Sequence, residues 1–117
     1  MKYMLLLRTD PTLAPAEGTP ESDAEMAEWG TLYGELTESG VLLSGMGLDD
    51  ESSATTLRTR NGEHVLTDGP FAETKELLFS FFILDVADLD AALSWADKMP
   101  NRKYGSVEVR PLSVHEQ

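Results

Sequence analysis

The sequence contains no cysteine and few basic residues, and these two deficits exclude several classes of protein. Without cysteine the chain can form no disulfide, no thiolate metal site and no thiol nucleophile. Nine Lys and Arg residues stand against 21 Asp and Glu residues, which gives a formal net charge of −12. Because nucleic acids and anionic membrane surfaces bind clustered basic residues, we expect neither as a partner. The acidic surface is expected to keep the protein soluble, and binding of a basic partner is the alternative.

The sequence also lacks any long apolar stretch. The first such stretch, residues 3–7, ends at Arg8 and is far shorter than the about 20 residues that a membrane helix needs. We therefore predict that it is a core strand and that the protein is cytoplasmic. With 117 residues, of which 41% are hydrophobic, the chain is expected to form a single domain spanning residues 1–117.

The apolar pattern predicts two β-α-β units separated by an inserted hairpin. The Asn61-Gly62 dipeptide suits a type I′ turn, and counting outward from it pairs Arg60 with Glu63 and Leu57 with Leu66. We expect strands at residues 1–8, 41–43, 54–60, 63–67, 77–86 and 106–110. The strand at 77–86 is almost entirely apolar, which predicts a central strand covered on both faces.

Two helices are predicted between these strands. Ser22 and Glu25 form a capping box that starts the first helix, and Gly40 ends it. One face of this helix is expected to carry four apolar or aromatic residues: Met26, Trp29, Tyr33 and Leu36. Asp88 is expected to cap the second helix and Pro100 to stop it. Its inward face is predicted to hold Leu89, Ala92, Leu93, Ala96 and Met99.

The resulting fold class is α+β, a ferredoxin-like split βαβ arrangement with an inserted β-hairpin. Both helices should cover one face of a mostly antiparallel sheet. The other face must also be covered, and the simplest cover is a second copy of the same sheet. We therefore predict a symmetric homodimer with a cleft between or beside the two sheets.

The segment Asp68–Glu76 is the most informative stretch of the sequence. It begins with Asp-Gly-Pro, which is typical of a turn, and Phe71 is expected to anchor the loop in the core. Glu73 and Lys75 then place opposite charges two residues apart, just before the central strand. Two readings stay open: a structural corner with solvated charges, or a polar rim that binds a ligand through Asp68, Glu73 and Lys75.

Residues 68–76 read DGPFAETKE, and this string resembles the DGPF branch of the YCII-related family. The flanking segments match the family along essentially the whole chain, from MKYMLL at the start to GSVEVRP near the end. The resemblance implies the dimeric α+β barrel fold, related to muconolactone isomerase and heme-degrading monooxygenases. It implies no agreed activity. Because members of this branch are often encoded beside extracytoplasmic-function sigma factors, the resemblance also makes a sigma-factor partner conceivable.

One departure from the family pattern affects any enzyme assignment. In the broader family, a His in the first helix paired with an Asp has been proposed as a catalytic pair. The first helix predicted here contains no His; Glu28 lies nearest that position, and the Asp position falls near Met99. A His–Asp mechanism is therefore not carried over to this chain.

The remaining candidates are two arginines and two aromatic residues. Arg8 and Arg110 lie at the ends of core strands, where each either pairs with an acidic neighbour or binds an anionic ligand. Trp29 and Tyr33 are one helical turn apart and suit the core better than a stacking platform for a ligand.

Metal and nucleotide sites are not expected. The two histidines, His64 and His115, have no second ligand at metal-binding spacing, so we expect no metal. No nucleotide-binding glycine motif is present, and no cofactor is expected.

Two functions remain open on the sequence alone. The first is binding or conversion of a small molecule in a cleft at the sheet face. The site residues would then come from Asp68, Phe71, Glu73, Lys75, Arg8, Arg110, Trp29 and Tyr33. The second is a non-enzymatic interaction or regulatory module whose acidic surface binds a basic region of another protein. An enclosed pocket with convergent polar groups favours the first.

Overall fold

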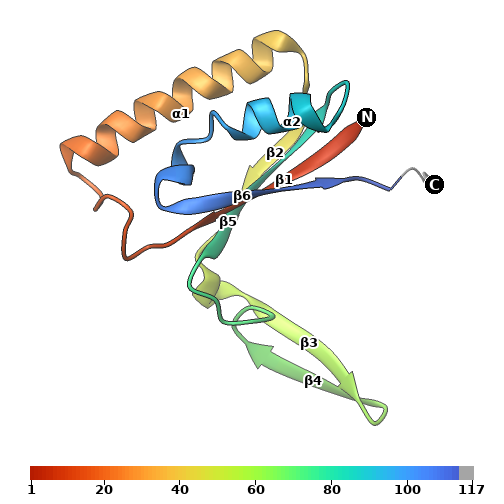
Figure 1. The fold of residues 1–117 in the computed structure, drawn as a ribbon. Helices are drawn as coiled ribbons and strands as arrows, with labels where there is room; N and C mark the ends of the chain where they lie inside the picture. Colours follow the sequence, from red (N-terminus) through yellow and green to blue (C-terminus); the bar gives the residue numbers. More distant parts are fainter. Residues whose placement is uncertain (114–117) are drawn as a thin grey trace.

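In the computed structural model, residues 1–113 are described and form an antiparallel sheet with two helices on one face and a separate hairpin (Figure 1). The elements in chain order are β1 (Lys2–Thr9), α1 (Pro20–Ser39), β2 (Leu42–Gly47), η1 (Glu51–Ser53), β3 (Thr55–Arg60), β4 (Glu63–Asp68), β5 (Leu77–Asp85), α2 (Leu89–Ala96), η2 (Pro100–Lys103) and β6 (Gly105–Pro111). The main sheet has the strand order β2-β5-β1-β6. The mixed α+β architecture with one antiparallel sheet and two helices is therefore as predicted.

The core lies between the sheet and the two helices. Alternate residues of β1 and β5 point into it, so that Leu5, Leu7 and Leu84 are completely buried. The intervening residues point to the opposite face of the sheet, which no helix covers. We call this surface the open sheet face; its apolar residues are Met4, Leu6, Met46, Phe81 and Ile83. Within the described residues only one face of β5 is covered, because both helices lie on the same side (Figure 1); cover of the other face by a second copy of the sheet stays a prediction.

The N-cap of helix α1 lies three residues before the predicted cap, Ser22. Thr19 is the N-cap, and its hydroxyl accepts a hydrogen bond from the Ser22 amide at 3.2 Å. The predicted Ser22–Glu25 capping box is therefore wrong, because Pro20 occupies the first helical turn, where its fixed φ is favourable. Gly40 ends the helix in the left-handed conformation, as predicted. No helix among residues 1–113 is long and apolar enough to cross a membrane.

The buried faces of the helices differ partly from those predicted. Leu32 and Leu36 are the buried residues of α1, whereas Met26 is exposed because it lies beyond the edge of the packed stripe. In α2, Ala92 and Ala96 are buried as predicted, but Leu89 and Leu93 remain half exposed. Small side chains face the sheet because the short helix lies close to it. Asp88 caps α2 through a hydrogen bond from the Ala91 amide at 2.9 Å, and the helix ends before Pro100, both as predicted.

Strand β2 is longer than predicted. Gly45 does not stop the strand, because its missing side chain leaves room for the ring of Phe82: a Cβ there would lie 2.7 Å from that ring. The strand continues to Gly47 and is followed by the polar loop that contains η1. This loop leads into the hairpin.

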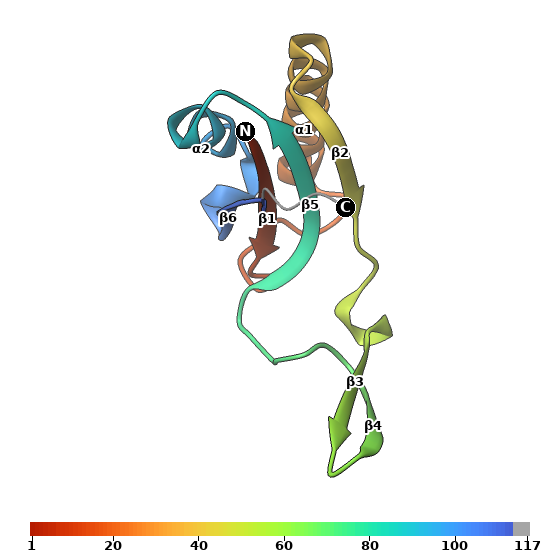
Figure 2. The same ribbon diagram turned by 90° about the vertical axis from the view of Figure 1, so that its right-hand side faces the viewer.

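The hairpin of β3 and β4 forms as predicted, but it stands apart from the main sheet. Its strands pair in the predicted register, with Arg60 opposite Glu63 and Leu57 opposite Leu66. The two strands form a sheet of their own and extend away from the body of the molecule (Figure 2). We use "the body" for the main sheet with its helices and "the hairpin" for β3 and β4.

Candidate functional site

The Asp-Gly-Pro turn at the end of β4 is fixed to the start of β3. The Gly69 amide donates to the Ala54 carbonyl at 2.7 Å, and the Thr56 hydroxyl donates to the Gly69 carbonyl at 2.8 Å. Gly69 has a φ of 108°, which a residue with a side chain rarely adopts. Asp68 is the last, exposed residue of β4. The first part of the DGPFAETKE segment is therefore a structural corner, in agreement with one of its two readings.

Phe71 does not reach the core. Its side chain is 80% exposed, and the Arg58 guanidinium lies 5.4 Å from the centre of its ring. Arg58 also donates to the Phe71 carbonyl oxygen at 3.0 Å. The predicted core anchor is wrong because the hairpin extends away from the body, so no interior exists at this point. Cation–π contact with Arg58 holds the ring at the base of the hairpin.

The charged half of the segment is attached to the body at two points. The Lys75 ammonium lies 3.8 Å from the Asp10 carboxylate, and the Glu76 carboxylate accepts a 2.5 Å hydrogen bond from Ser106. Glu73 does not join them; it lines a small cavity of about 250 Å³ together with Glu51. Lys75 and Glu76 therefore set the position of the loop, and Glu73 and Lys75 do not form one polar rim.

Asp10 is a buried carboxylate that the sequence reasoning missed. It is 3% exposed and accepts hydrogen bonds from the Thr12 hydroxyl at 2.6 Å and from the Thr12 amide at 3.0 Å. The Thr12 hydroxyl, followed by the Thr12 amide and the Lys75 charge, lowers the pKa of Asp10 below its ordinary value of 3.8, although burial acts in the opposite direction. The Asp10-Pro11-Thr12 sequence was a usable signal, because Asp commonly bonds the backbone two residues later in a turn.

Arg8 and Arg110 share one acidic neighbour on the open sheet face. An Arg8 nitrogen lies 2.7 Å from one Glu108 carboxylate oxygen, and the Arg110 Nε lies 3.7 Å from the other. Pairing with an acidic neighbour, one of the two expected alternatives, is therefore confirmed for both arginines. Only Arg8 also lines a cavity, which lies between the main sheet and the base of the hairpin.

Trp29 and Tyr33 lie on the helix-covered side of the sheet. Trp29 packs edge-on against Phe79 with ring centres 6.4 Å apart, and Tyr33 contacts Phe82 at the same distance. Trp29 is half buried beside the core, as expected, whereas Tyr33 is 51% exposed at its edge. The sheet separates both aromatic residues from Arg8, because Phe82 and Arg8 point to opposite faces. The eight predicted site residues therefore do not converge on one place.

The cavity that contains Arg8 is the best-formed candidate site. It has a volume of about 500 Å³, within the range of about 300–1,000 Å³ typical of small-molecule pockets. Its walls are mostly apolar and come from Leu77 and Leu78 of β5 and from Ala54 and Phe71 at the hairpin base. Asp49, Asp50 and Glu51 also line it. We call this cavity the cleft. It brings together two predicted site residues, Arg8 and Phe71, and leaves out the other six.

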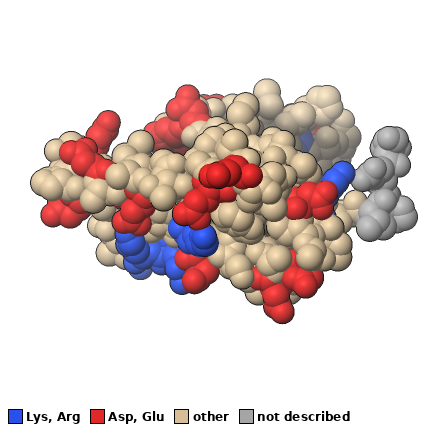
Figure 3. Space-filling view, turned by 90° about the horizontal axis from the view of Figure 1, so that it is seen from above, with Lys and Arg blue, Asp and Glu red and all other residues tan. Residues whose placement is uncertain are grey.

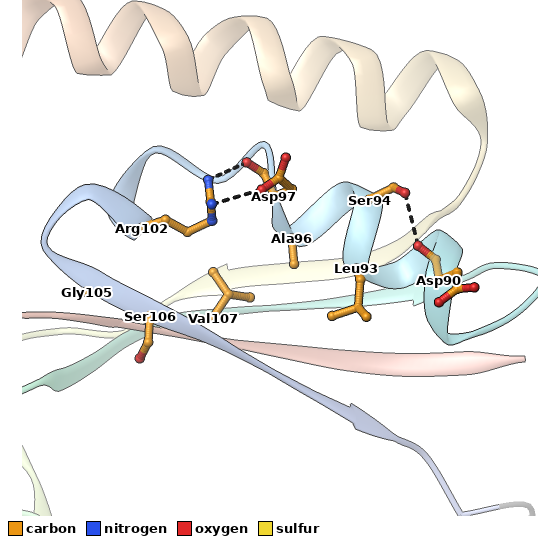
Figure 4. Close-up of a pocket in the computed structure, with 9 residues that line it drawn as sticks. All are labelled: Asp90, Leu93, Ser94, Ala96, Asp97, Arg102, Gly105, Ser106 and Val107. Atoms are coloured by element: carbon orange, nitrogen blue, oxygen red, sulfur yellow. Dashed lines mark hydrogen bonds and ion pairs between the residues drawn. The ribbon is translucent and has the colours of Figure 1, made fainter.

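A second hollow, between α2 and β6, is larger but has less to offer a ligand (Figure 4). Its volume is about 700 Å³, and Leu93, Ala96 and Val107 face one another across it. Its cation, Arg102, lies 2.9 Å from the Asp97 carboxylate and donates to the Asp97 carbonyl oxygen at 2.8 Å. The hollow also has fewer apolar lining residues than the cleft. None of the predicted ligand-binding residues lines it.

The positions that correspond to the proposed family His–Asp pair serve a structural role in this chain. Glu28 pairs with Lys103 at 2.9 Å and so ties α1 to η2, while Met99 is buried in the core. Beside this ion pair the Tyr104 hydroxyl donates a hydrogen bond to Glu25. The pKa of Tyr104 is raised, mainly by burial and then by this bond and by the charges of Glu25 and Glu28. Within residues 1–113 no group of three His, Asp or Glu side chains could hold a metal, and His115 lies outside the described residues.

Comparison with known proteins shows which proteins this chain resembles. A family model described as the YCII-related domain matches residues 1–115. An uncharacterized protein of Rhizobium meliloti (strain 1021) is 37% identical over 117 residues, covering 98% of this chain and 94% of the relative. Among solved structures, 5-chloro-2-hydroxyhydroquinone dehydrochlorinase from Burkholderia phenoliruptrix AC1100, in complex with 2,5-dihydroxybenzoquinone, superposes with a TM-score of 0.49 at 14% identity, covering 97% of this chain and 94% of that one.

Proposed function

This chain belongs to the YCII-related family, and we propose that it is a small-molecule-binding protein whose site is the cleft. The observation that carries this proposal is the cleft itself: a mostly apolar cavity of about 500 Å³ whose lining includes one cationic side chain, Arg8, which also pairs with Glu108. The three acidic residues that also line it disfavour polyanions. The ligand class we propose is therefore an amphipathic molecule with an apolar body and at most one anionic group. The proposal assigns binding and no reaction.

A screen of ligands by thermal unfolding tests this proposal. A compound present at 100 times its Kd adds about 2.7 kcal/mol of stability, which raises the Tm of a domain of this size by roughly 10 °C. Ala54→Trp fills the cleft and is expected to abolish the shift. Ala27→Trp places the same side chain on the exposed surface of α1 and is expected to preserve it. If no amphipathic compound stabilises the wild type, or if Ala54→Trp leaves the shift intact, the proposal fails.

We further infer the finer assignments of branch, topology and assembly. The string at residues 68–76 supports membership of the DGPF branch, and the strand order β2-β5-β1-β6 supports the ferredoxin-like form of the dimeric α+β barrel. The uncovered open sheet face supports a homodimer, because Met46 on it is 64% exposed and a second sheet would bury it. The cytoplasmic location stays a prediction.

The acidic helix surface supports the alternative function, a regulatory module that binds a basic region such as one on a sigma factor. Acidic side chains lie along the helix side of the molecule, whereas most of the basic atoms visible there form one cluster and a further basic side chain lies at the opposite end (Figure 3). Glu28 and Glu35 of α1 are paired with lysines, while Glu21 and Asp23 have no ion pair among the described residues. Binding of a basic peptide that weakens when Glu21 and Asp23 are replaced by Gln and Asn, while the cleft binds nothing, would favour this alternative.

A further inference from the structure

One face of the hairpin carries two exposed leucines and is left uncovered by the described chain. Leu57 and Leu66 lie opposite each other on this face and are 59% and 70% exposed. Thr59 and His64, the next pair toward the turn, share the face. We call these four residues the clasp face. A two-stranded hairpin is marginally stable alone in water and is stabilised when its apolar face is covered. The clasp face therefore points to a contact outside the chain.

The charge of the hairpin differs from that of the body. The two strands carry Arg58 and Arg60 against Glu63 and Asp68, so the net charge of −12 lies entirely on the rest of the chain. Arg58 is held by Phe71, whereas Arg60 at the tip has no ion pair among the described residues. A neutral hairpin is not repelled by a second, strongly acidic body, so the charge pattern permits a second copy of the same chain as the partner.

The position of the hairpin suits the same partner. It extends beyond the end of the main sheet (Figures 1 and 2), and the cleft lies where the two join, with Arg8 on the sheet side and Phe71 on the hairpin side. In a two-fold dimer every contact occurs twice. The uncovered hairpin face of each chain can therefore cover the uncovered sheet face of the other chain. A stable interface uses about 20–30 residues a side. The residues of the main sheet that point to the open sheet face are too few to reach this number, and residues of the hairpin would supply the rest of the interface.

We propose that the clasp face packs against the open sheet face of a second copy of this chain, so that each hairpin closes the cleft of its partner. This inference rests on the dimer and the cleft proposed above and deepens them: the site is complete only in the dimer, with Leu57 and Leu66 of one chain forming a wall of the other chain's cleft.

Cross-linking tests the contact directly, because the chain has no cysteine of its own. Leu66→Cys on one preparation and Met46→Cys on a second, size-tagged preparation are mixed and treated with a short bifunctional maleimide. We expect a mixed cross-linked dimer. Val65→Cys is the matched control: it is the neighbouring residue of β4 but points to the other face of the hairpin, and its yield with Met46→Cys is expected to be at least tenfold lower. Equal yields, or no mixed dimer with Leu66→Cys, would overturn the proposal.

Sedimentation of charged variants provides the second measurement. Leu66→Asp is expected to weaken dimerisation at least tenfold, while Val65→Asp leaves it unchanged; circular dichroism checks that both variants fold. A wild type that sediments as a monomer, or a Leu66→Asp variant that dimerises like the wild type, contradicts the clasp. Ligand binding separates the two proposals. If a compound binds in the cleft but the clasp contact does not form, the proposed function is supported and the clasp is refuted. If the clasp contact forms but no compound binds, the clasp is supported and the proposed function is refuted.

Discussion

The body and the hairpin use similar side chains for different purposes. In the body, β1 and β5 send alternate residues into a core in which Leu5 and Leu84 are completely buried. In the hairpin the same alternation leaves Leu57 and Leu66 largely exposed, because no helix covers that sheet. The difference shows that alternation predicts which residues share a face, whereas only the surroundings decide whether the face is buried.

The largest expected effect on stability comes from replacing leucine by alanine, which we compare between the body and the hairpin. Leu84→Ala in the body removes a fully buried side chain and is expected to cost about 2–5 kcal/mol, through lost burial and a new cavity. Leu57→Ala in the hairpin removes a side chain that is 59% exposed and should cost less than about 1 kcal/mol. Urea unfolding of both variants, at a low protein concentration, measures the contrast. Equal costs would mean that the hairpin is part of the core.

A second comparison uses two glycines. A Cβ at Gly105 would lie 2.0 Å from the Arg8 carbonyl oxygen, so Gly105→Ala forces β6 away from β1 and is expected to cost about 1–3 kcal/mol or more. Gly62, at the hairpin turn, has open space around it and a φ of 80°, so Gly62→Ala should cost about 1 kcal/mol from backbone strain alone. Thermal unfolding would rank the two variants, and a milder effect at Gly105 would contradict the close approach of β1 and β6.

The hydrogen bond between Tyr104 and Glu25 lies within the body, and its loss is expected to change the stability of the body. Tyr104→Phe is expected to cost about 0.5–1.5 kcal/mol at neutral pH, toward the lower end because the bond is only partly buried. Because the pKa of Tyr104 is raised in the folded chain, its contribution is complete below the unfolded value of 10.0 and is lost as the pH rises beyond it. Urea unfolding at neutral and strongly alkaline pH should show the difference from wild type shrinking. A difference that grows with pH would refute this assignment.

The smallest expected effect lies where the loop after the hairpin joins the body. Asp10→Asn keeps an oxygen that accepts from Thr12 but loses the attraction to Lys75, so only a slight loss of stability is expected at pH 7. Because the pKa of Asp10 is lowered on folding, its contribution is present above 3.8 and is lost as the pH falls below that value. Melting temperatures of the wild type and the variant should therefore converge in acid. Lys75→Ala serves as the control for the ion pair, with a similarly small effect.

Local chemistry made much of the fold predictable. Asn61-Gly62 specified the hairpin turn and its register, Asp88 and Gly40 specified helix ends, and the apolar run of β5 specified an interior strand. The first cap was mispredicted because Ser22–Glu25 and Thr19–Pro20 are both good start signals, and the sequence pattern does not rank them. The candidate site was predicted only in part, since Arg8 and Phe71 line the cleft while Asp68, Glu73 and Lys75 turn elsewhere.

The sequence by itself determined the family, the α+β class, the strand register of the hairpin and the turn at Gly69, because each depends on residues close together in the chain. Tertiary structure alone decided that the hairpin stands away from the body, that Phe71 is exposed, and that Asp10 is buried beside Lys75. These outcomes depend on which surfaces meet across long stretches of chain, and such contacts leave no periodic mark on the residues that make them.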